Sequence, residues 1–362
     1  MLSTFAFLSV ISFLISFLLT LPTIRWAKKF NLTDDISKRP HPAHTHKGII
    51  PRAGGVPIFL GILLPILFLL KINPQIIGII IGSLILVLVG LWDDVHDRSP
   101  YIRFLFNCLA ALAVILSGVT IPYITNPLGG VIHFDSISKT LPFLGFDLTI
   151  SVAQILALVW IVWTTNIVGW SGGVDGQLPG FVSISAIVIG LLSLRYIADP
   201  NQYYVSALSF LTAGAFMGFL PWNFFPQKIM PGYGGKTLAG FMLATLAILS
   251  YAKFGTALLV LAVPMTDAAF IFFRRLFSGK SPVKATSGHL HHHLLKIGWG
   301  KRRIALFYWS ISLSAGLLAL FLSPKQKLFA AFLIVIVIFS FILWVNFFKK
   351  LPEKTTNGNT YF

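Results

Sequence analysis

Long apolar runs recur from one end of this chain to the other, and they favour a membrane fold over a soluble one. Hydrophobic residues make up 56% of the 362 residues and charged residues only 11%, whereas a soluble domain carries roughly 25% charged residues. A run of about 20 apolar residues lets a helix cross a hydrocarbon layer of roughly 30 Å. The sequence therefore predicts an all-α polytopic membrane protein.

The runs predict about eleven transmembrane helices. The first run is too long for a signal peptide and has no cation before it, so we expect it to be retained as a span. Of the 28 lysines and arginines, 22 fall on one set of connections, Arg103 at the edge of a span included. The positive-inside rule makes that side cytoplasmic, with the N-terminus outside and the C-terminus inside the plasma (inner) membrane. The expected spans are residues 2–22, 54–70, 75–92, 101–121, 150–168, 180–197, 202–220, 237–252, 254–273, 304–322 and 328–347.

The chain is expected to form a single transmembrane domain, residues 1–348, with a polar cytoplasmic tail, residues 349–362. Alternation near residues 125–148 predicts a small β-hairpin on the outer face. The net charge of +17 does not indicate a nucleic-acid partner, because it is not gathered on a soluble domain. The partner expected from composition is the lipid bilayer.

Carboxylates are rare in this chain, and three of them gather at the cytoplasmic end of the third span. The segment "GLWDDVHDRSPYIRF" holds Asp93, Asp94 and Asp97, out of eleven acids in the whole sequence. Such a cluster is unfavourable at a membrane boundary unless positive charge offsets it. Mg²⁺ binds through one or two carboxylates together with substrate phosphates. A solvated, acid-capped helix end is the alternative, and we favour a functional site.

Three further cytoplasmic loops suit an anionic ligand. "NIVGWSGGVDGQLPG" sets Asp175 between glycines, and "PWNFFPQKIMPGYGGKT" carries Asn223 and Lys236 beside a glycine-rich turn. Glycines let backbone N–H groups approach a phosphate closely. The first loop, "DDISKRPHPAHTHKGIIPRAGG", is strongly basic. Ordinary turns in the first two cases, and contact with anionic lipid in the third, are the alternatives.

The segment "TSGHLHHHLLKIGWGKRR" packs four histidines and several cations together. His289 with His292 or His293 has the helical spacing that a zinc site would use. However, no cysteine lies on this side and no glutamate accompanies the histidines. Imidazoles among cations are hydrogen-bond donors for a polyanion, which favours a diphosphate.

Together these loops resemble the polyprenyl-phosphate N-acetylhexosamine-1-phosphate transferases, membrane enzymes of the glycosyltransferase family 4 type. The resemblance covers nearly the whole chain and includes "HKGIIPRAGG", "GLWDDVHDRSPYIR", "GFLPWNFFPQKI" and "PMTDAAFIFFRRLFSGKSPVKATSGHLHHHLL". The H-L-H-H form is similar to the branch that uses UDP-N-acetylglucosamine or a related UDP-sugar. The resemblance implies transfer of N-acetylhexosamine 1-phosphate to undecaprenyl phosphate with release of UMP, which initiates cell-envelope polysaccharide synthesis. It also implies Mg²⁺, or Mn²⁺ in its place, as the cofactor, and it is compatible with a homodimer.

The resemblance assigns roles to particular residues. Asp93, Asp94 and Asp175 are the expected catalytic acids, with Asp94 and Asp175 as metal ligands. The remaining expected site residues bind substrate: Lys47, Arg103, Asn166, Asn223, Lys236, His289, His291, His292 and His293.

At two loops the chain departs from the pattern of this family. The family's D-G-x-D-G reads "GGVDG", so Gly172 replaces the first acid. Its M-G-D-x-G-S reads "PGYGGK", so Tyr233 stands where an Mg²⁺-ligating aspartate is expected and Lys236 replaces the serine. Three outcomes stay open: the remaining acids hold the metal with substrate oxygens, Lys236 partly substitutes for it, or the chain binds without turnover. A transporter is disfavoured, because only Asp267 lies well inside a span.

Overall fold

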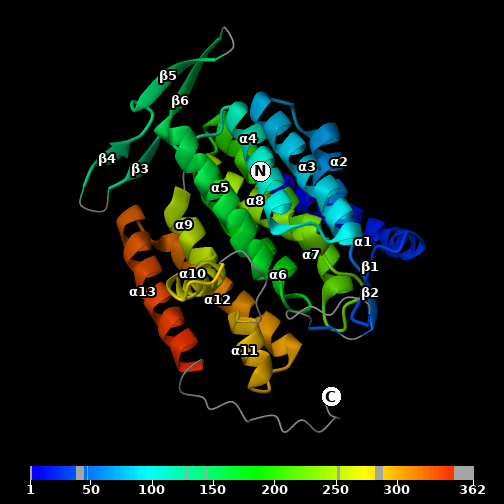
Figure 1. Cartoon of the computed structure of the whole chain (residues 1–362). Helices are drawn as coiled ribbons and strands as arrows, with labels where there is room; N and C mark the ends of the chain where they lie inside the picture. Colours follow the sequence, from blue (N-terminus) through cyan, green and yellow to red (C-terminus); the bar gives the residue numbers. More distant parts are fainter. Residues whose placement is uncertain are drawn as a thin grey trace.

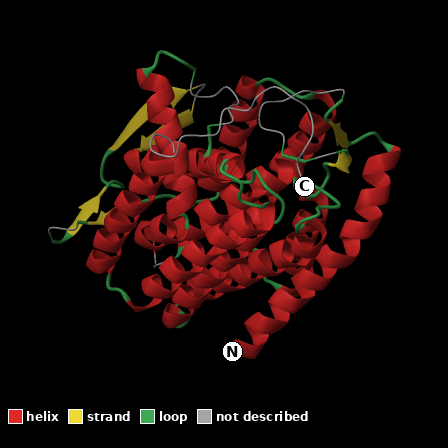
Figure 2. Cartoon of the chain, turned by 90° about the horizontal axis from the view of Figure 1, so that it is seen from below, coloured by secondary structure: helices red, strands yellow, loops and turns green. Residues whose placement is uncertain are grey.

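The computed structural model describes residues 2–37, 45–46, 48–126, 129–143, 146–250, 253–281 and 288–345. These residues form one bundle that is helical almost throughout, with strands only at its margins (Figures 1 and 2). The long helices are α1 (Leu2–Lys29), α2 (Gly55–Leu69), α3 (Pro74–His96), α4 (Pro100–Leu116), α5 (Val152–Trp170), α6 (Gln177–Ser193), α7 (Pro200–Asn223), α8 (Gly232–Leu249), α10 (Ala262–Phe277), α12 (Lys301–Phe321) and α13 (Pro324–Leu343). The short ones are α9 (Lys253–Val260), α11 (Leu290–Lys296) and the 3₁₀ turn η1 (Leu194–Tyr196).

Four helices of the bundle begin with the same local device, a capping side chain followed by proline. The caps of α3, α4, α7 and α13 are Asn73, Ser99, Asp199 and Ser323, and each accepts a hydrogen bond from a backbone N–H of the first turn. Proline is favourable at the next position, because its fixed φ suits a helix and the missing N–H has no partner there anyway. The capping residue and the proline therefore determine where each of these helices begins.

Each of the eleven predicted spans coincides with helical residues, but some of these helices are shorter than a membrane span. Among the described residues, eight helices are long and apolar enough to cross a membrane, namely α1, α3, α5, α6 with η1, α7, α8, α12 and α13. Helices α2 and α4 are apolar but shorter. Exposed side chains on α13, such as Phe329 and Phe332, are apolar, which suits a surface surrounded by lipid. The chain thus has the helices of a polytopic membrane protein, while the count of eleven spans stays a prediction.

The predicted span 254–273 is broken into α9 and α10 at Leu261. Pro264 has no N–H to donate, and its ring clashes with the carbonyl four residues earlier. That carbonyl belongs to Val260, and it accepts a hydrogen bond from the Ser312 hydroxyl at 3.0 Å instead. A neighbouring helix therefore supplies the hydrogen bond that this carbonyl lost, as a membrane interior requires.

Close helix packing sets the position of the polar loops. Helix α7 packs between α1 and α6, and α8 packs between α3 and α5. A Cβ built on Gly90 of α3 would lie 2.2 Å from the Cα of Gly234 in α8. Only glycine allows the two backbones to approach so closely. This contact brings the acidic end of α3 against the start of α8.

The strands form three antiparallel pairs. β1 (Thr33–Asp35) pairs with β2 (Ile49–Pro51), β3 (Tyr123–Thr125) with β4 (Val131–His133), and β5 (Ser138–Phe143) with β6 (Phe146–Ser151). The hairpin expected near residues 125–148 is thus two hairpins rather than one. Hairpin β5–β6 lies at the opposite end of the bundle from β2 and α11 (Figure 1). The predicted tail, residues 349–362, lies outside the described residues.

Candidate active site

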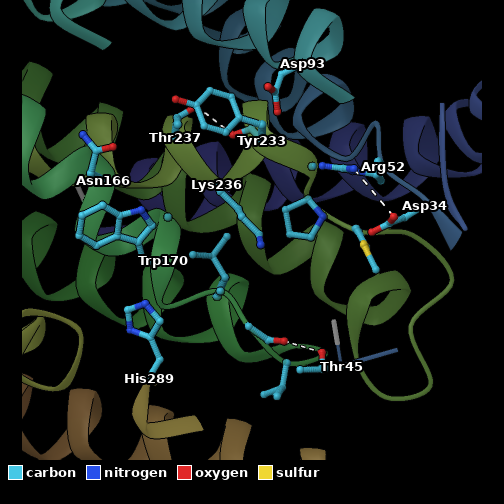
Figure 3. Close-up of a pocket in the computed structure, with 18 of the residues that line it drawn as sticks. Asp34, Thr45, Arg52, Asp93, Asn166, Trp170, Tyr233, Lys236, Thr237 and His289 are labelled. Carbon is cyan, nitrogen blue, oxygen red and sulfur yellow. Dashed lines mark hydrogen bonds and ion pairs between the residues drawn. The ribbon is translucent and has the colours of Figure 1, made fainter. Parts of the chain in front are cut away.

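A cavity of about 350 Å³ lies among α3, α4, α5, α8, α11 and the loops beside them. Its wall brings together side chains that are far apart in the sequence (Figure 3). The structure thereby gathers most of the predicted site residues around one space. Those that line it are Asp93, Arg103, Asn166, Asn223, Lys236, His289, His291 and His292.

Four predicted residues do not stand in the described cavity wall. Asp94 and Asp175 are buried just behind it, each with 2% exposure, and His293 lies on α11 outside the wall. Lys47 lies outside the described residues.

Asp93 is the acid of the predicted pair that reaches the cavity. Its Oδ1 accepts from Arg103 Nε at 2.6 Å and from the backbone N–H of Arg98 at 3.0 Å. Arg103 also donates to Asp97 at 2.6 Å, so one guanidinium bridges two carboxylates. The second oxygen of Asp93, Oδ2, is buried and has no hydrogen-bond partner among the described residues. A buried carboxylate oxygen without a donor is unfavourable, which indicates that a ligand or a proton completes this group.

Asp94 is held by an arginine from the first loop. Arg52 Nε lies 3.1 Å from Asp94 Oδ1, and the backbone N–H of Tyr233 donates to the same oxygen at 3.1 Å. Burial lowers the pKa of Arg52, but the nearby carboxylates, Asp94 first and then Asp34, outweigh it and leave that pKa raised. Arg52 therefore stays charged, and the pair fastens the first loop to the junction of α3 and α8.

Asp175 is held in the same way by the first residue of α12. Lys301 Nζ lies 2.9 Å from Asp175 Oδ1, and the backbone N–H of Gln227 donates to the other oxygen at 3.2 Å. Asn223 secures the neighbouring turn, because its Oδ1 accepts from the N–H of Gly176 at 3.0 Å and its Nδ2 donates to the carbonyl of Ile229 at 2.9 Å. Both predicted site residues therefore shape the loop between α5 and α6.

Tyr233 and Lys236, the two departures at the start of α8, both line the cavity. The Tyr233 hydroxyl donates to Asn107 Oδ1 at 3.2 Å, and its ring lies under the Arg103 guanidinium, 5.3 Å from centroid to carbon. Lys236 extends into the middle of the residues drawn in Figure 3. Within the described residues no carboxylate oxygen lies within 4.0 Å of its Nζ, since every ion pair there uses another cation.

Asp267 and Gly173 position the histidines. His289 Nδ1 lies 3.0 Å from Asp267 Oδ2, and the N–H of Leu290 donates to Asp267 Oδ1 at 2.8 Å. His291 packs so closely on the glycine loop that a Cβ on Gly173 would fall 1.9 Å from its Nε2. The rings of His291 and His292 lie 4.3 Å apart.

Burial and nearby positive charge keep the imidazoles of His291, His292 and His293 neutral. Burial first, then His292 and His289, hold the pKa of His291 well below its usual value. The same causes, burial and then His289, lower the pKa of His292 to about 4. The pKa of His293 is also lowered, by burial and then by Lys296. A neutral imidazole can donate one N–H to an anion and can gain a proton when negative charge arrives.

Several residues of the site were not predicted from the sequence. Lys301 and Arg52 lie in basic stretches that gave no sign of a specific acid partner. Asp267 stood out only as the acid inside a span, and its role is to hold His289. Thr45 donates to the carbonyl of Gly173 at 2.6 Å and brings the first loop into the cavity wall. Only Asp267 carried a usable signal, because a lone buried acid needs a partner.

Comparison with known proteins places these features in a family. The family model of glycosyl transferase family 4 matches residues 76–251. The chain is 28% identical to the undecaprenyl-phosphate alpha-N-acetylglucosaminyl 1-phosphate transferase of Thermotoga maritima, over 96% of this chain and 98% of the relative. It is 26% identical to a probable undecaprenyl-phosphate N-acetylglucosaminyl 1-phosphate transferase of Bacillus subtilis, over 91% and 89%. It is 30% identical to the decaprenyl-phosphate N-acetylglucosaminephosphotransferase of Mycobacterium tuberculosis, over 75% and 71%.

The matched region, which includes α4, α5 and α8 and nearly all of α3, supplies most of the residues of the cavity wall. The helices of a multi-pass membrane protein, the shared cavity and similarity along nearly the full length of relatives agree with one another. The chain belongs to glycosyl transferase family 4.

Proposed function

We propose that this protein transfers N-acetylhexosamine 1-phosphate from a UDP-N-acetylhexosamine to a polyprenyl phosphate such as undecaprenyl phosphate. The names of the three relatives support this transfer and favour it over a relative that binds without turnover. The observation that carries the proposal is the cavity itself. Within the part of the chain that the structure describes, a carboxylate oxygen without a partner, an ammonium group without a carboxylate and neutral imidazoles meet there between apolar helices.

The bonds that form and break in this reaction belong to the two substrates. An oxygen of the lipid phosphate forms a bond to the β-phosphorus of the UDP-sugar. The bond from that phosphorus to the bridging oxygen breaks, and UMP leaves with this oxygen. The product is a sugar diphospholipid. Such a transfer depends mainly on positioning and on neutralising charge at the phosphates.

Asp93 is placed to act on the lipid phosphate. Its free Oδ2 can accept the proton of a monoprotonated phosphate, while Arg103 holds its other oxygen at 2.6 Å. A fixed orientation of the acceptor matters because proton transfer requires hydrogen-bond geometry. Arg103, which is partly exposed, and Lys236 supply positive charge beside it.

The histidines suit the diphosphate of the donor. His291 and His292 line the cavity as neutral imidazoles, so each can donate an N–H to a phosphate oxygen.

Asn166 is oriented by two hydrogen bonds: its Nδ2 donates to Val162 O at 2.8 Å, and Asn107 Nδ2 donates to its Oδ1 at 3.3 Å. We also keep Lys47 as a phosphate-binding cation from the first loop.

The residues present do not fit the predicted Mg²⁺ or Mn²⁺ site. Asp94 and Asp175 were the expected ligands, but each is buried behind the wall and paired with a cation. In the described part of the chain, no group of three His, Cys, Asp or Glu side chains is arranged to hold a metal. Of the described acids that line the cavity, Asp93 and Asp97 are held by Arg103, and Asp34 lies beside Arg52. No step of the mechanism above passes through a metal ion.

The proposal includes a location. Described polar loops, α11 and the β1–β2 pair lie at one end of the bundle (Figure 1), and the connections predicted to be cytoplasmic carry 22 of the 28 lysines and arginines. We assign this end to the cytoplasmic face of the plasma membrane, with eleven spans and a single domain over residues 1–348. Cysteine labelling tests the topology: a cysteine at Ser136 should react with a membrane-impermeant maleimide in intact cells, and one at Ser278 should not.

The direct test of the function is UMP release. Purified protein in detergent is incubated with UDP-N-acetylglucosamine and undecaprenyl phosphate, and UMP and the diphospholipid are measured together. We expect equal amounts of the two products, and none when the lipid phosphate is left out. Binding of the UDP-sugar without UMP release would favour the non-catalytic alternative.

A further inference from the structure

Lys236 occupies the centre of the site, and no carboxylate of the described residues pairs with it. It lies in the second turn of α8 and lines the cavity. The acids of the described wall are taken by other cations: Arg103 holds Asp93 and Asp97, and Arg52 lies 3.9 Å from Asp34. A lysine placed in this way stays available for a ligand of negative charge.

The two positions that flank Lys236 offer no ligand to a divalent ion. A Cβ on Gly172 would lie 3.5 Å from Lys236 Cε, so this position faces the lysine but bears no carboxylate. Tyr233 points its hydroxyl at Asn107, and a neutral phenol is a poor ligand for Mg²⁺. Both sites at which an acid would draw a metal towards the phosphates are therefore uncharged, and the lysine stands between them.

We infer that the Lys236 ammonium is the fixed cation that binds the donor diphosphate in this protein, so that transfer proceeds without a divalent metal ion. This inference rests on the proposed function. The ammonium can donate to oxygens of both phosphates, because it carries three N–H groups on a flexible stem. Arg103 and the imidazoles of His291 and His292 add donors around the same space. The bonds made and broken are those of the transfer already described.

The test compares the unmodified protein with Mg²⁺ and with EDTA, by UMP release and by calorimetric titration with UDP. We expect UMP release within about threefold under the two conditions, and the same UDP affinity. Lys236→Met should weaken UDP binding in EDTA by about 10-fold or more, the loss typical of a hydrogen bond to a charged group. Lys228→Met is the matched control, because Lys228 is exposed outside the cavity and rests on the Trp222 ring. It should change neither quantity.

A second variant tests the inference from the other direction. The double change Lys236→Ser with Tyr233→Asp supplies a carboxylate and removes the ammonium, and it should make UDP binding depend on Mg²⁺. The wild-type comparison stands even if a variant fails to fold. UMP release that EDTA abolishes and Mg²⁺ restores would overturn the inference and leave the proposed function intact. UMP release under neither condition would refute the proposed function, and the UDP titration in EDTA would then decide alone whether Lys236 holds a diphosphate.

Discussion

The contact between Gly90 and Gly234 makes a sharp prediction, because it sets the distance from the acids of α3 to the start of α8. In Gly90→Ala the new Cβ would lie 2.2 Å from Gly234 Cα, and ordinary contact begins at 3.4 Å. The helices must therefore separate by about 1 Å locally. Overpacking of this kind destabilises a protein by about 1–3 kcal/mol, and a 1 Å displacement of catalytic groups can lower turnover about 100-fold.

The assay measures UMP release per folded molecule, together with the midpoint of thermal unfolding followed by tryptophan fluorescence. Gly82→Ala is the control, because its Cβ would lie 2.5 Å from Phe241 Cζ and 2.8 Å from Ala110 O. It strains the packing of the same helix about 12 Å along the axis from Gly90, on the side away from Asp93. Both variants should unfold at lower temperature, but only Gly90→Ala should lose turnover about 100-fold. Turnover within threefold of wild type in Gly90→Ala would refute the view that this contact positions the site.

Three further predictions concern the charged groups. Lys301→Met leaves Asp175 buried and unpaired and should lower stability by about 3–5 kcal/mol; the double variant with Asp175→Asn should recover most of this in thermal unfolding, and equal losses in both would contradict the pairing. Burial lowers the pKa of His292 to about 4, against 6.5 in the unfolded chain. Its contribution to the free energy of unfolding, about 3 kcal/mol, is therefore complete above pH 6.5 and is lost as the pH falls towards 4. In His292→Gln the unfolding temperature should depend less on pH over that range, and an unchanged slope would exclude His292 as the cause. Asp93→Asn should lower UMP release about 100-fold or more with UDP affinity unchanged, whereas unaltered turnover would remove this acid from the mechanism.

The membrane fold was predictable because its cause is local. Apolar runs and the caps before proline mark the helices without reference to the rest of the chain. The break at Leu261 was missed, although Pro264 signalled it, because the surrounding residues remain apolar on both sides. A hydropathy pattern records length and polarity, and it does not record that the Val260 carbonyl finds Ser312 on another helix.

The candidate site was predictable only in part. Rare acids and clustered histidines drew attention to particular loops, and the structure brings Asp93, His291 and His292 from them into one cavity. The partners of the other acids could not be predicted, since Asp94 with Arg52 and Asp175 with Lys301 are pairs formed by the tertiary fold. For this reason Asp94 and Asp175 were expected to face a metal, whereas each is paired with a cation behind the wall.

The most direct measurement of the central claim is a structure of the protein in lipid nanodiscs with UDP-N-acetylglucosamine bound, determined by electron cryomicroscopy. The account predicts the diphosphate inside the cavity, with an oxygen within hydrogen-bond distance of Lys236 Nζ and another near His291 or His292. A nucleotide bound elsewhere, or a diphosphate whose oxygens do not reach Lys236, would contradict it.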